Sequence, residues 1–444
     1  MSKKFRDWLF IAFIALFIIT TFFVSLYAAG YTLNRQWPPR FNQLFQKTGM
    51  LVLDSEPSGA DIFINDIEQR RPVLLDLGRD NITTPTKIKN LPPGEYNLRL
   101  EKDGYWPLEK KIYINSGQST FAEDFILFKK SLPLNLTICA PQAVSLSPDK
   151  KNLILPNDGL VINLKTEISS NLKKIASTTS VQWSKNSDQI LWGNDLINLS
   201  GEKSGYNLKA LGQEAQNFFW DENNKKIYYQ SGGNISCVLT DKNTISTILS
   251  GSDYVAYTVR DDLIYTVEKQ NHQNYLRVYD ASSAILKSSS DLPNGEYQFH
   301  QDEYSLNLYD KKQHALYLIN ASSPQPIVRQ VRPVVSWQWL SNNFLVWHNE
   351  FEIYSLDIDN NRQELLIRVS EPITGIAWSR ANNYLIYASS QQIQIVNLGL
   401  DKRTPIALLK AEQITSIFLD EKNQLLYFYA QIGQQAGIYK LQLQ

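Results

Sequence analysis

The sequence contains few of the side chains that cross-link a fold or bind a transition metal. Its 444 residues include two cysteines and four histidines. Cys139 and Cys237 fall in different units of a repeat described below, so we expect no disulfide and a fold that is held together by packing. The histidines have no spacing typical of a zinc site, and we predict no metal. They are His272, His300, His314 and His348.

The sequence also lacks an excess of charge of either sign. Its 44 basic residues balance 44 acidic residues, which leaves no electrostatic footprint for nucleic acid. We therefore expect neither DNA nor RNA as a partner. The hydrophobic fraction of 43% and the aromatic fraction of 12% exclude a disordered chain. At this length we expect more than one folded unit.

Motifs of catalysis and cofactor binding are missing as well. The sequence has no glycine loop that would cradle a phosphate and no Gly-x-Ser-x-Gly nucleophile elbow. The nearest approach to a reactive cluster is His300 with Asp302 and Glu303, which can meet at one turn. Carboxylates beside a histidine in such a turn are more often a solvated hairpin, and we interpret them so.

A second polar group faintly resembles a calcium loop. Asp357 and Asp359 are followed by Asn360 and Asn361, but the glycine and the distal glutamate of such a loop are missing. We therefore predict no catalytic, cofactor-binding or metal-binding residue anywhere in the chain.

One long hydrophobic run stands near the N-terminus. Residues 8–29 carry no charge, and at about 1.5 Å per residue a helix of this length spans the roughly 30 Å hydrocarbon layer of a bilayer. A cleaved signal peptide is the alternative. We favour an uncleaved anchor, because the run exceeds the usual apolar core of a signal peptide and Tyr27 would occupy the small-residue position of a cut before Gly30.

Charge near the ends of this run predicts its orientation. Three basic residues crowd residues 1–7, whereas the basic residues that follow the run are spread over 30–48. We expect residues 1–7 to form a cytoplasmic stub, 8–29 to cross the cell membrane once, and 30–48 to link the anchor to extracytoplasmic domains. The basic residues are Lys3, Lys4 and Arg6 before the run, and Arg35, Arg40 and Lys47 after it.

A small β domain is predicted for about residues 49–129. Leu51 and Leu53 alternate with polar residues, and Ile62 and Ile64 do the same after the turn at 57–60, which predicts a β-hairpin. Three further alternating runs follow, separated by proline and glycine. This spacing is typical of a small sandwich whose chain reverses direction every 8 to 12 residues.

These residues resemble the PEGA domain, which is named after a four-residue turn. The chain carries that turn as Pro57-Ser58-Gly59-Ala60, with serine in the second position and a longer loop at 67–81. The resemblance implies a β-sandwich of bacterial and archaeal envelope proteins without established catalytic residues. Each matched residue also has a structural role in a turn or a thin core, which we prefer to a binding role. The further matches are Thr84-Pro85, Leu91, Pro93-Gly94-Glu95-Tyr96, Gly104-Tyr105 and Pro107.

From about residue 143 onward one short pattern recurs eight times. Each unit has an apolar or aromatic anchor at the end of a strand, a polar turn, and further apolar strands, and consecutive anchors lie 37 to 42 positions apart. That is the length of one four-stranded blade, so we predict a β-propeller of eight blades, or of seven with a degenerate edge unit. The anchors are Leu146, Trp183, Trp220, Tyr257, Phe299, Trp339, Trp378 and Leu419.

The order of strands predicts how the ring closes. The last unit supplies three strands and then stops, while an additional strand at about 132–138 precedes the first anchor. We expect this strand to complete the last blade, which gives a propeller over residues 131–444 without an open edge.

The repeats resemble Tol-type and WD-like propellers of bacteria. Ser147-Pro148-Asp149 keeps three positions of the Ser-Pro-Asp-Gly-like turn of those repeats, and the other units replace the proline. We expect the tryptophan anchors Trp183, Trp220, Trp339 and Trp378 to pack between blades rather than to stack on carbohydrate.

Two functional classes remain. The first is a non-enzymatic, membrane-anchored binding or scaffolding protein of the cell envelope, whose propeller presents loops to a protein, peptide or glycan. The second is an extracytoplasmic propeller enzyme, a lyase or glycoside hydrolase, whose acid and base converge from several blades. We favour the first. The sequence alone identifies neither the partner nor the oligomeric state.

Overall fold

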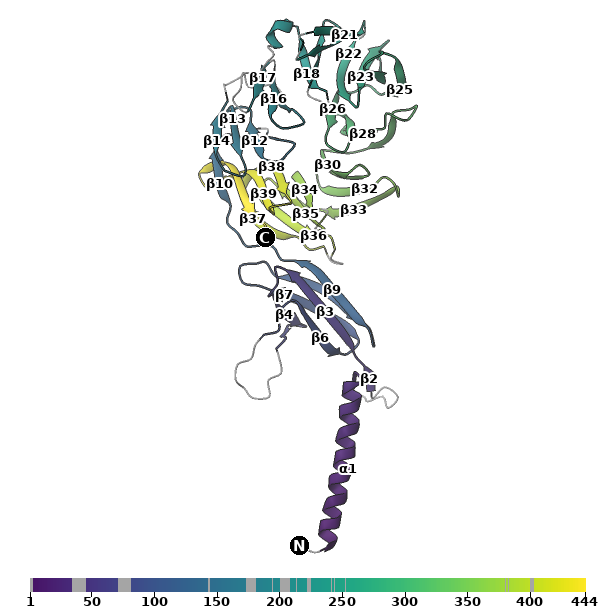
Figure 1. The fold of residues 1–444 in the computed structure, drawn as a ribbon, viewed down its shortest axis with the longest axis vertical. Helices are drawn as coiled ribbons and strands as arrows, with labels where there is room; N and C mark the ends of the chain where they lie inside the picture. The colour runs from purple at the N-terminus through teal and green to yellow at the C-terminus, as the bar shows by residue number, and fades with distance from the viewer. Residues whose placement is uncertain are drawn as a thin grey trace. The chain divides into compact units, whose positions relative to one another are not determined.

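The computed structural model describes most of the chain. In these residues it is almost entirely β, with one α-helix (Figure 1). The described ranges are 3–33, 45–70, 81–142, 144–172, 181–193, 195–199, 208–212, 214–221, 225–240, 242, 244–251, 253–379, 381, 383–399 and 403–444. The chain divides into two compact units, Met1–Leu132 with Asn397–Ile406 and Leu441–Gln444, and Pro133–Val396 with Ala407–Lys440.

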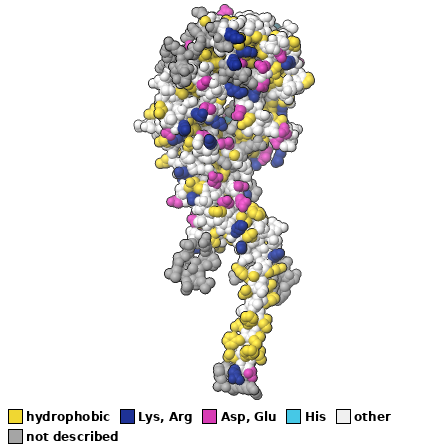
Figure 2. Space-filling view, viewed as in Figure 1, with side chains coloured by type: hydrophobic (Ala, Val, Ile, Leu, Met, Phe, Trp, Pro, Cys, Tyr) yellow, Lys and Arg dark blue, Asp and Glu magenta, His cyan; other side chains and the backbone are white. Residues whose placement is uncertain are grey.

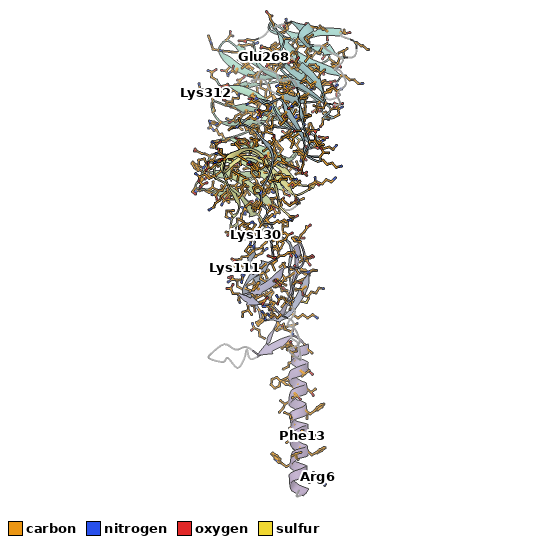
Figure 3. All side chains as sticks on the ribbon, turned by 90° about the vertical axis from the view of Figure 1, so that its left-hand side faces the viewer. Arg6, Phe13, Lys111, Lys130, Glu268 and Lys312 are labelled. Atoms are coloured by element: carbon orange, nitrogen blue, oxygen red, sulfur yellow. The ribbon has the colours of Figure 1, made fainter. Side chains whose placement is uncertain are left out.

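Helix α1 (Lys3–Ala28) is formed by the hydrophobic run. Within the described residues it is the helix whose length and composition suit a membrane span, with a mean hydropathy of 2.7 over Arg6–Ala28. Its apolar side chains, Phe13 among them, are exposed along the helix (Figures 2 and 3). The Thr20 hydroxyl donates to the Leu16 carbonyl at 2.8 Å, so this polar group is satisfied inside the helix.

Two short strands follow the helix and pair antiparallel with each other. They are β1 (Tyr31–Leu33) and β2 (Phe45–Lys47).

Two sheets then form a small sandwich. In the first, the central strand β3 pairs antiparallel with β6 and parallel with β9. The second has the strand order β5-β4-β7-β8. Residues such as Leu51, Ile62 and Leu98 alternate inward from both sheets and are at most 1% exposed. The bounds are β3 (Gly49–Glu56), β4 (Asp61–Ile64), β5 (Ile67–Glu68), β6 (Thr86–Leu91), β7 (Gly94–Glu101), β8 (Leu108–Ile114) and β9 (Ser119–Ile126).

The predicted hairpin over residues 49–64 is wrong. Strands β3 and β4 lie in different sheets, and the turn at 57–60 carries the chain from one sheet to the other. Thr84 holds this crossing. Its hydroxyl accepts from the Ala60 amide at 3.0 Å and bonds the Ser55 hydroxyl at 2.6 Å, while its carbonyl accepts from the Gly59 amide at 2.7 Å. The matched residues at 57–60 and 84 therefore stabilise one corner of the sandwich.

The second unit is a β-propeller. Among the described residues its strands form eight sheets, seven of four strands and one of three, and seven of the eight take their strands in chain order. The strands before β22 are β10 (Leu134–Ile138), β11 (Ser145–Leu146), β12 (Asn152–Leu155), β13 (Leu160–Asn163), β14 (Ser169–Asn171), β15 (Val181–Trp183), β16 (Gln189–Trp192), β17 (Asp195–Asn198), β18 (Gln216–Trp220), β19 (Lys226–Ser231), β20 (Asn234–Leu239) and β21 (Thr244–Ser250), with a 3₁₀ helix at Leu208–Leu211.

The remaining strands continue the same pattern to the end of the propeller. They are β22 (Tyr254–Arg260), β23 (Leu263–Gln270), β24 (Gln273–Asp280), β25 (Leu286–Leu292), β26 (Tyr297–Gln301), β27 (Leu306–Asp310), β28 (Ala315–Ile319), β29 (Ile327–Val331), β30 (Ser336–Ser341), β31 (Phe344–His348), β32 (Glu352–Asp357), β33 (Arg362–Arg368), β34 (Ile373–Ser379), β35 (Tyr384–Ser389), β36 (Gln392–Asn397), β37 (Ile406–Lys410), β38 (Glu412–Asp420), β39 (Leu425–Ile432) and β40 (Gln435–Gln442).

The remaining sheet joins the two ends of the propeller. Strand β10 pairs antiparallel with β40, with Leu134 opposite Lys440 and Ile138 opposite Gly437, in the order β10-β40-β39-β38 (Figure 1). The strand expected at about 132–138 thus supplies the fourth strand of the last blade. Gly437 permits this close pairing, because a Cβ at that position would lie 2.0 Å from the Thr137 carbonyl oxygen.

A buried charged cluster lies inside the blade that contains β23 and β24, and its carboxylate belongs to Glu268, which Figure 3 labels. Glu268 is fully buried and accepts hydrogen bonds from Arg277 at 2.7 Å, Tyr279 at 2.7 Å and Thr266 at 2.8 Å. Every partner lies on β23 or β24, so the carboxylate is satisfied within the blade, and we assign it to stability.

We predict that Gly437→Ala lowers the free energy of unfolding by about 2 kcal/mol, because the new methyl group forces β10 away from β40. Denaturant unfolding of the full chain, followed by circular dichroism, measures the change. Gln435→Ala, at an exposed position of the same strand, is the control and leaves the midpoint unchanged. Equal midpoints for the two variants would show that the contact between β10 and β40 is looser than described.

We predict that Arg277→Met destabilises the chain by about 3–5 kcal/mol, because it leaves the Glu268 carboxylate buried without its ion-pair partner. The same unfolding measurement tests this. Arg362→Met is the matched control, since Arg362 is largely exposed and pairs with Glu364 at 3.7 Å, where an ion pair contributes about 0–1 kcal/mol. Addition of Glu268→Gln to Arg277→Met is expected to recover part of the loss. A cost below about 1 kcal/mol for Arg277→Met contradicts the assignment.

Candidate functional site

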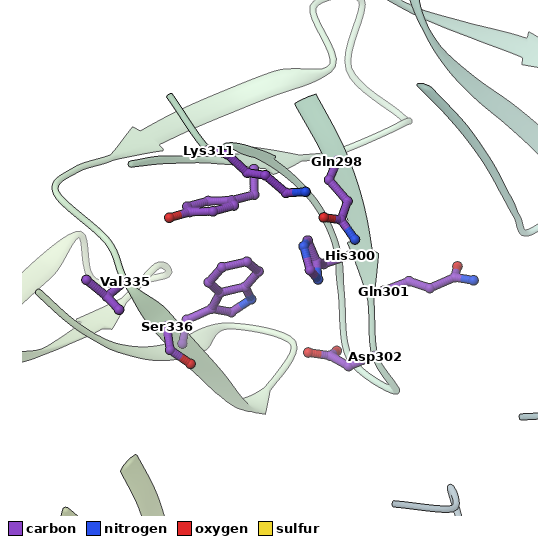
Figure 4. A pocket seen from close by; sticks show the side chains of 9 residues that line it. Gln298, His300, Gln301, Asp302, Lys311, Val335 and Ser336 are labelled. Carbon is purple, nitrogen blue, oxygen red and sulfur yellow. The ribbon is translucent and has the colours of Figure 1, made fainter. Parts of the chain in front are cut away.

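A hollow of about 410 Å³ lies between the blade that begins with β26 and the blade that begins with β30 (Figure 4). Polar and aromatic side chains from both blades surround it, and Figure 4 shows Lys311 and Gln298 on one side of the hollow and Asp302 on the other. The lining residues are Gln298, His300, Gln301, Asp302, Tyr309, Lys311, Val335, Ser336 and Trp337.

Strand alternation explains how β26 contributes to this wall. Gln298 and His300 of β26 are two residues apart, so their side chains leave the backbone on the same side, and Asp302 follows directly after the strand. Gln301 alternates with them, and its side chain points away from His300 at the rim of the hollow (Figure 4). The alternate residues Tyr297 and Phe299 belong instead to the apolar core that β26 shares with β22, β27 and β28. The next blade contributes the start of β30, including Trp337.

Three rings form the aromatic part of the wall. The rings of His300 and Trp337 meet nearly at right angles, with centroids 5.0 Å apart, and Tyr309 lies 5.2 Å from Trp337. Tyr309 is fixed by its hydroxyl, which donates to the Val334 carbonyl at 2.9 Å. The edge-to-face contact of His300 and the tilted contact of Tyr309 hold the Trp337 ring in one orientation. The wall is therefore preorganised.

Asp302 has a structural role as well as a place in the wall. Its Oδ1 atom accepts from the amides of Tyr304 and Ser305, each at 2.8 Å, which closes the turn between β26 and β27. Arg260 of the preceding blade donates to the backbone carbonyls of Asp302 at 2.8 Å and Glu303 at 3.2 Å. Equivalent turn-closing side chains recur in other blades. They are Ser147, Ser184, Asp221 and Asp420.

The cluster singled out in the sequence is thus partly brought together. His300 and Asp302 both line the hollow, whereas Glu303 is not part of its lining. Asp302 also forms the hairpin turn that the sequence suggested. Trp337 was missed, because it stands two residues before the anchor Trp339 on the same face of β30, and alternation alone predicts that it is a further core residue.

Desolvation shifts the pKa values of His300 and Asp302 in opposite directions. Desolvation, with a smaller effect of the Lys311 cation, holds the pKa of His300 below its usual value, so the ring is neutral at pH 7. Desolvation raises the pKa of Asp302, although the backbone amides of Ser305 and Tyr304 oppose the shift.

Several side chains that line the hollow have hydrogen-bonding groups that no described protein group uses. In the part of the chain that the structure describes, the side chains of Gln298, Gln301, His300 and Ser336 make no hydrogen bond. Asp302 uses Oδ1 in its turn and keeps Oδ2 free of protein partners within the same ranges. The hollow therefore offers donors and acceptors beside an aromatic surface.

The other sequence candidates do not gather into a site. His314 bonds the Tyr309 hydroxyl at 3.1 Å, and His348 is fully buried. Asp357 accepts from Asn360, and Asp359 from Asn343, so hydrogen bonds within the turns engage these carboxylates. No group of three or more potential metal ligands occurs among the described residues.

The tryptophan anchors lie between blades, mostly in the core. Trp220, Trp339 and Trp378 are 8%, 5% and 7% exposed, and Trp183 donates to the Ser145 hydroxyl of the preceding blade at 3.0 Å. Phe344 meets Trp378 edge-on at a centroid distance of 5.5 Å. This packing agrees with the expectation from the sequence.

Comparison with known proteins finds one matching family and several similar solved structures. Residues 48–123 match the PEGA domain family, which confirms the resemblance given above. Among solved structures, the chain is similar to the Dos1 propeller, with 12% identity, a TM-score of 0.48, and coverage of 71% of this chain and 96% of that one.

Two further solved structures are similar. One is the Cps50 (Swd1) β-propeller of Myceliophthora thermophila, with 11% identity, a TM-score of 0.38, and coverage of 70% of this chain and 100% of that one. The other is the dihydro-heme d1 dehydrogenase NirN, with 10% identity, a TM-score of 0.43, and coverage of 65% and 68%. At these identities the similarity concerns the fold alone. No curated protein sequence matches the chain.

We predict that Lys311→Met raises the pKa of His300, because the substitution removes a nearby cation that opposes protonation. The pKa of His300 stays below its usual value in this variant, since desolvation is the larger cause. NMR titration of histidine-labelled protein measures it. Lys312→Met, next in sequence but outside the hollow, is the control and leaves the titration unchanged.

The sign of the associated stability effect follows from the lowered pKa. The unfolded chain binds the His300 proton more tightly than the folded chain does, so this contribution to stability is present above about pH 6.5 and declines as the pH falls. A His300 pKa that falls in Lys311→Met, or that does not move, contradicts the placement of Lys311 beside the ring.

Proposed function

We propose that this chain is a non-enzymatic, membrane-anchored binding protein of the cell envelope, and that its propeller is the interaction platform. The observation that carries the proposal is the hollow between β26 and β30, where polar side chains with unused hydrogen-bonding groups surround Trp337. Such a mixture of a few polar groups and an aromatic surface is typical of ligand sites.

The N-terminal region supports an extracytoplasmic location. The basic residues Lys3, Lys4 and Arg6 favour a cytoplasmic N-terminus, with α1 as a single-pass anchor. Residues 30–48 then serve as a linker, 49–129 as a PEGA-like spacer and 131–444 as the propeller, closed by β10. The propeller reaches its partner outside the cytoplasmic membrane.

The chemistry of the hollow favours binding over catalysis. Among the described residues that line it, Asp302 is the one carboxylate, and one of its oxygens already closes a turn. Glycoside hydrolysis uses two carboxyl groups about 5–10 Å apart. His300 beside Asp302 is the feature that favours the alternative, an extracytoplasmic lyase or glycoside hydrolase that acts on an envelope polymer.

We predict that a photo-crosslinking amino acid at Gln301 captures the partner in intact membranes. Gln301 lines the hollow and is exposed, so a probe there reaches a bound molecule without disturbing the core. The same probe at Gln363, on the exposed strand β33, is the control. Gel shifts and mass spectrometry measure the adducts, and we expect at least a tenfold excess from position 301.

Two results would count against the proposal. Equal adduct yields at the two positions would show that the hollow is not the contact surface. Turnover of an envelope polymer by the full chain, lost in His300→Gln, would instead support the enzymatic alternative.

A further inference from the structure

The charges around the hollow disfavour a strongly charged ligand. Lys311 lies on one side and Asp302 on the other (Figure 4). The lysine therefore repels a bound cation, and the carboxylate repels a bound anion. Lys311 is also 3.8 Å from Glu296, which balances its charge further. A neutral ligand is the one that neither side repels.

The uncommitted side chains of the hollow both donate and accept hydrogen bonds. Gln298 carries a carboxamide, with an NH₂ donor and a carbonyl acceptor, and Ser336 carries a hydroxyl. The neutral ring of His300 has one donor and one acceptor nitrogen. Side chains that both donate and accept hydrogen bonds complement a ligand whose groups also donate and accept. Hydroxyl groups have this property.

The aromatic wall complements such a ligand. Trp337 is half-buried and lines the hollow, while His300 and Tyr309 fix its orientation from within the wall. The apolar C–H face of a sugar ring packs on an aromatic surface while its hydroxyls turn outward to polar groups. Trp337 packs against the same core cluster as Trp339 but keeps part of its ring exposed, whereas Trp339 and Trp378 are buried.

The size of the hollow limits the ligand. A volume of about 410 Å³ is near the lower end of the range of about 300–1,000 Å³ for small-molecule sites. An extended peptide gains its affinity from main-chain pairing along a sheet edge, with side-chain pockets adding specificity. Here side chains from β26 and β30 form the wall, which favours recognition of a ring over recognition of a main chain.

From these observations we infer that the hollow binds one or two residues of a neutral glycan, with a sugar ring against Trp337 and its hydroxyls on Gln298 and Ser336. The inference rests on the proposed function and names the ligand class of the same site. The hollow holds the glycan and performs no chemistry on it.

Isothermal titration of the full chain tests the inference. The protein is placed in phosphatidylcholine nanodiscs, because maltoside detergents carry a sugar headgroup, and is titrated with chitotetraose and with maltotetraose. We expect saturable binding of at least one of these neutral oligosaccharides. A tetramer of glucosamine, which is cationic, and a tetramer of galacturonic acid, which is anionic, are expected to bind at least tenfold more weakly.

Variants place the binding in the hollow. Gln298→Leu and Ser336→Ala each remove one hydrogen-bonding group and are expected to weaken binding about tenfold. Gln325→Leu, in the exposed connection between β28 and β29, is the matched control and leaves the affinity unchanged. Unfolding midpoints are measured for each variant, so that a loss of fold is not taken for a loss of binding.

The outcomes separate this inference from the proposed function. Saturable neutral-glycan binding that both hollow variants weaken supports the glycan. An absence of saturable binding to both neutral oligosaccharides, a preference for a charged one, or hollow variants that bind like Gln325→Leu overturns it. If the glycans fail while crosslinking from Gln301 still exceeds that from the control position, the binding platform stands and the ligand class is wrong.

Discussion

The pairing of β10 with β40 is the constraint on which the propeller depends. A stack of twisted sheets has two ends, and each end presents apolar side chains and unpaired backbone groups unless the ends meet. Here one strand from the beginning of the propeller completes a sheet whose other three strands come from its end. Closure fixes the spacing of all the blades at once, including the two that enclose the hollow. The close approach of Gly437 to the Thr137 carbonyl is part of that closure.

The hollow arises from variation within a repeated plan. Five of the described blades have a turn-closing serine or aspartate after the first strand, so the backbone positions at these turns are similar. Elsewhere a ring occupies the junction between blades, as Phe219 does against Tyr257 at 5.0 Å. At the junction of β26 and β30, His300 and Trp337 meet edge to face, and polar side chains surround the remaining space. The blades share one backbone plan, whereas the polar hollow lies at the junction of β26 and β30.

Much of the fold could be predicted from the sequence, because its signals are local. Alternation, turn residues and the spacing of Trp183, Trp220 and Trp378 indicate strands and blades without reference to distant parts of the chain. The predicted hairpin at 49–64 was wrong for the same reason, because alternation identifies the two faces of a strand but not the strand with which it pairs. The hollow was beyond this kind of argument. His300 could be noticed, but Trp337 comes from the next repeat, and only the packed structure brings the two rings together.

The separation of β10 and β40 in the sequence also determines when the propeller can close during synthesis. Strand β10 ends at Ile138 and β40 begins at Gln435, so about 300 residues separate the two partners. At a synthesis rate of roughly 5–20 residues per second, β10 waits on the order of 15–60 s for its partner. During that interval the blades already synthesised have one uncovered side. A chaperone that binds the nascent chain has to cover this side until β40 is made. The pairing of β40 with β10 ends this exposure.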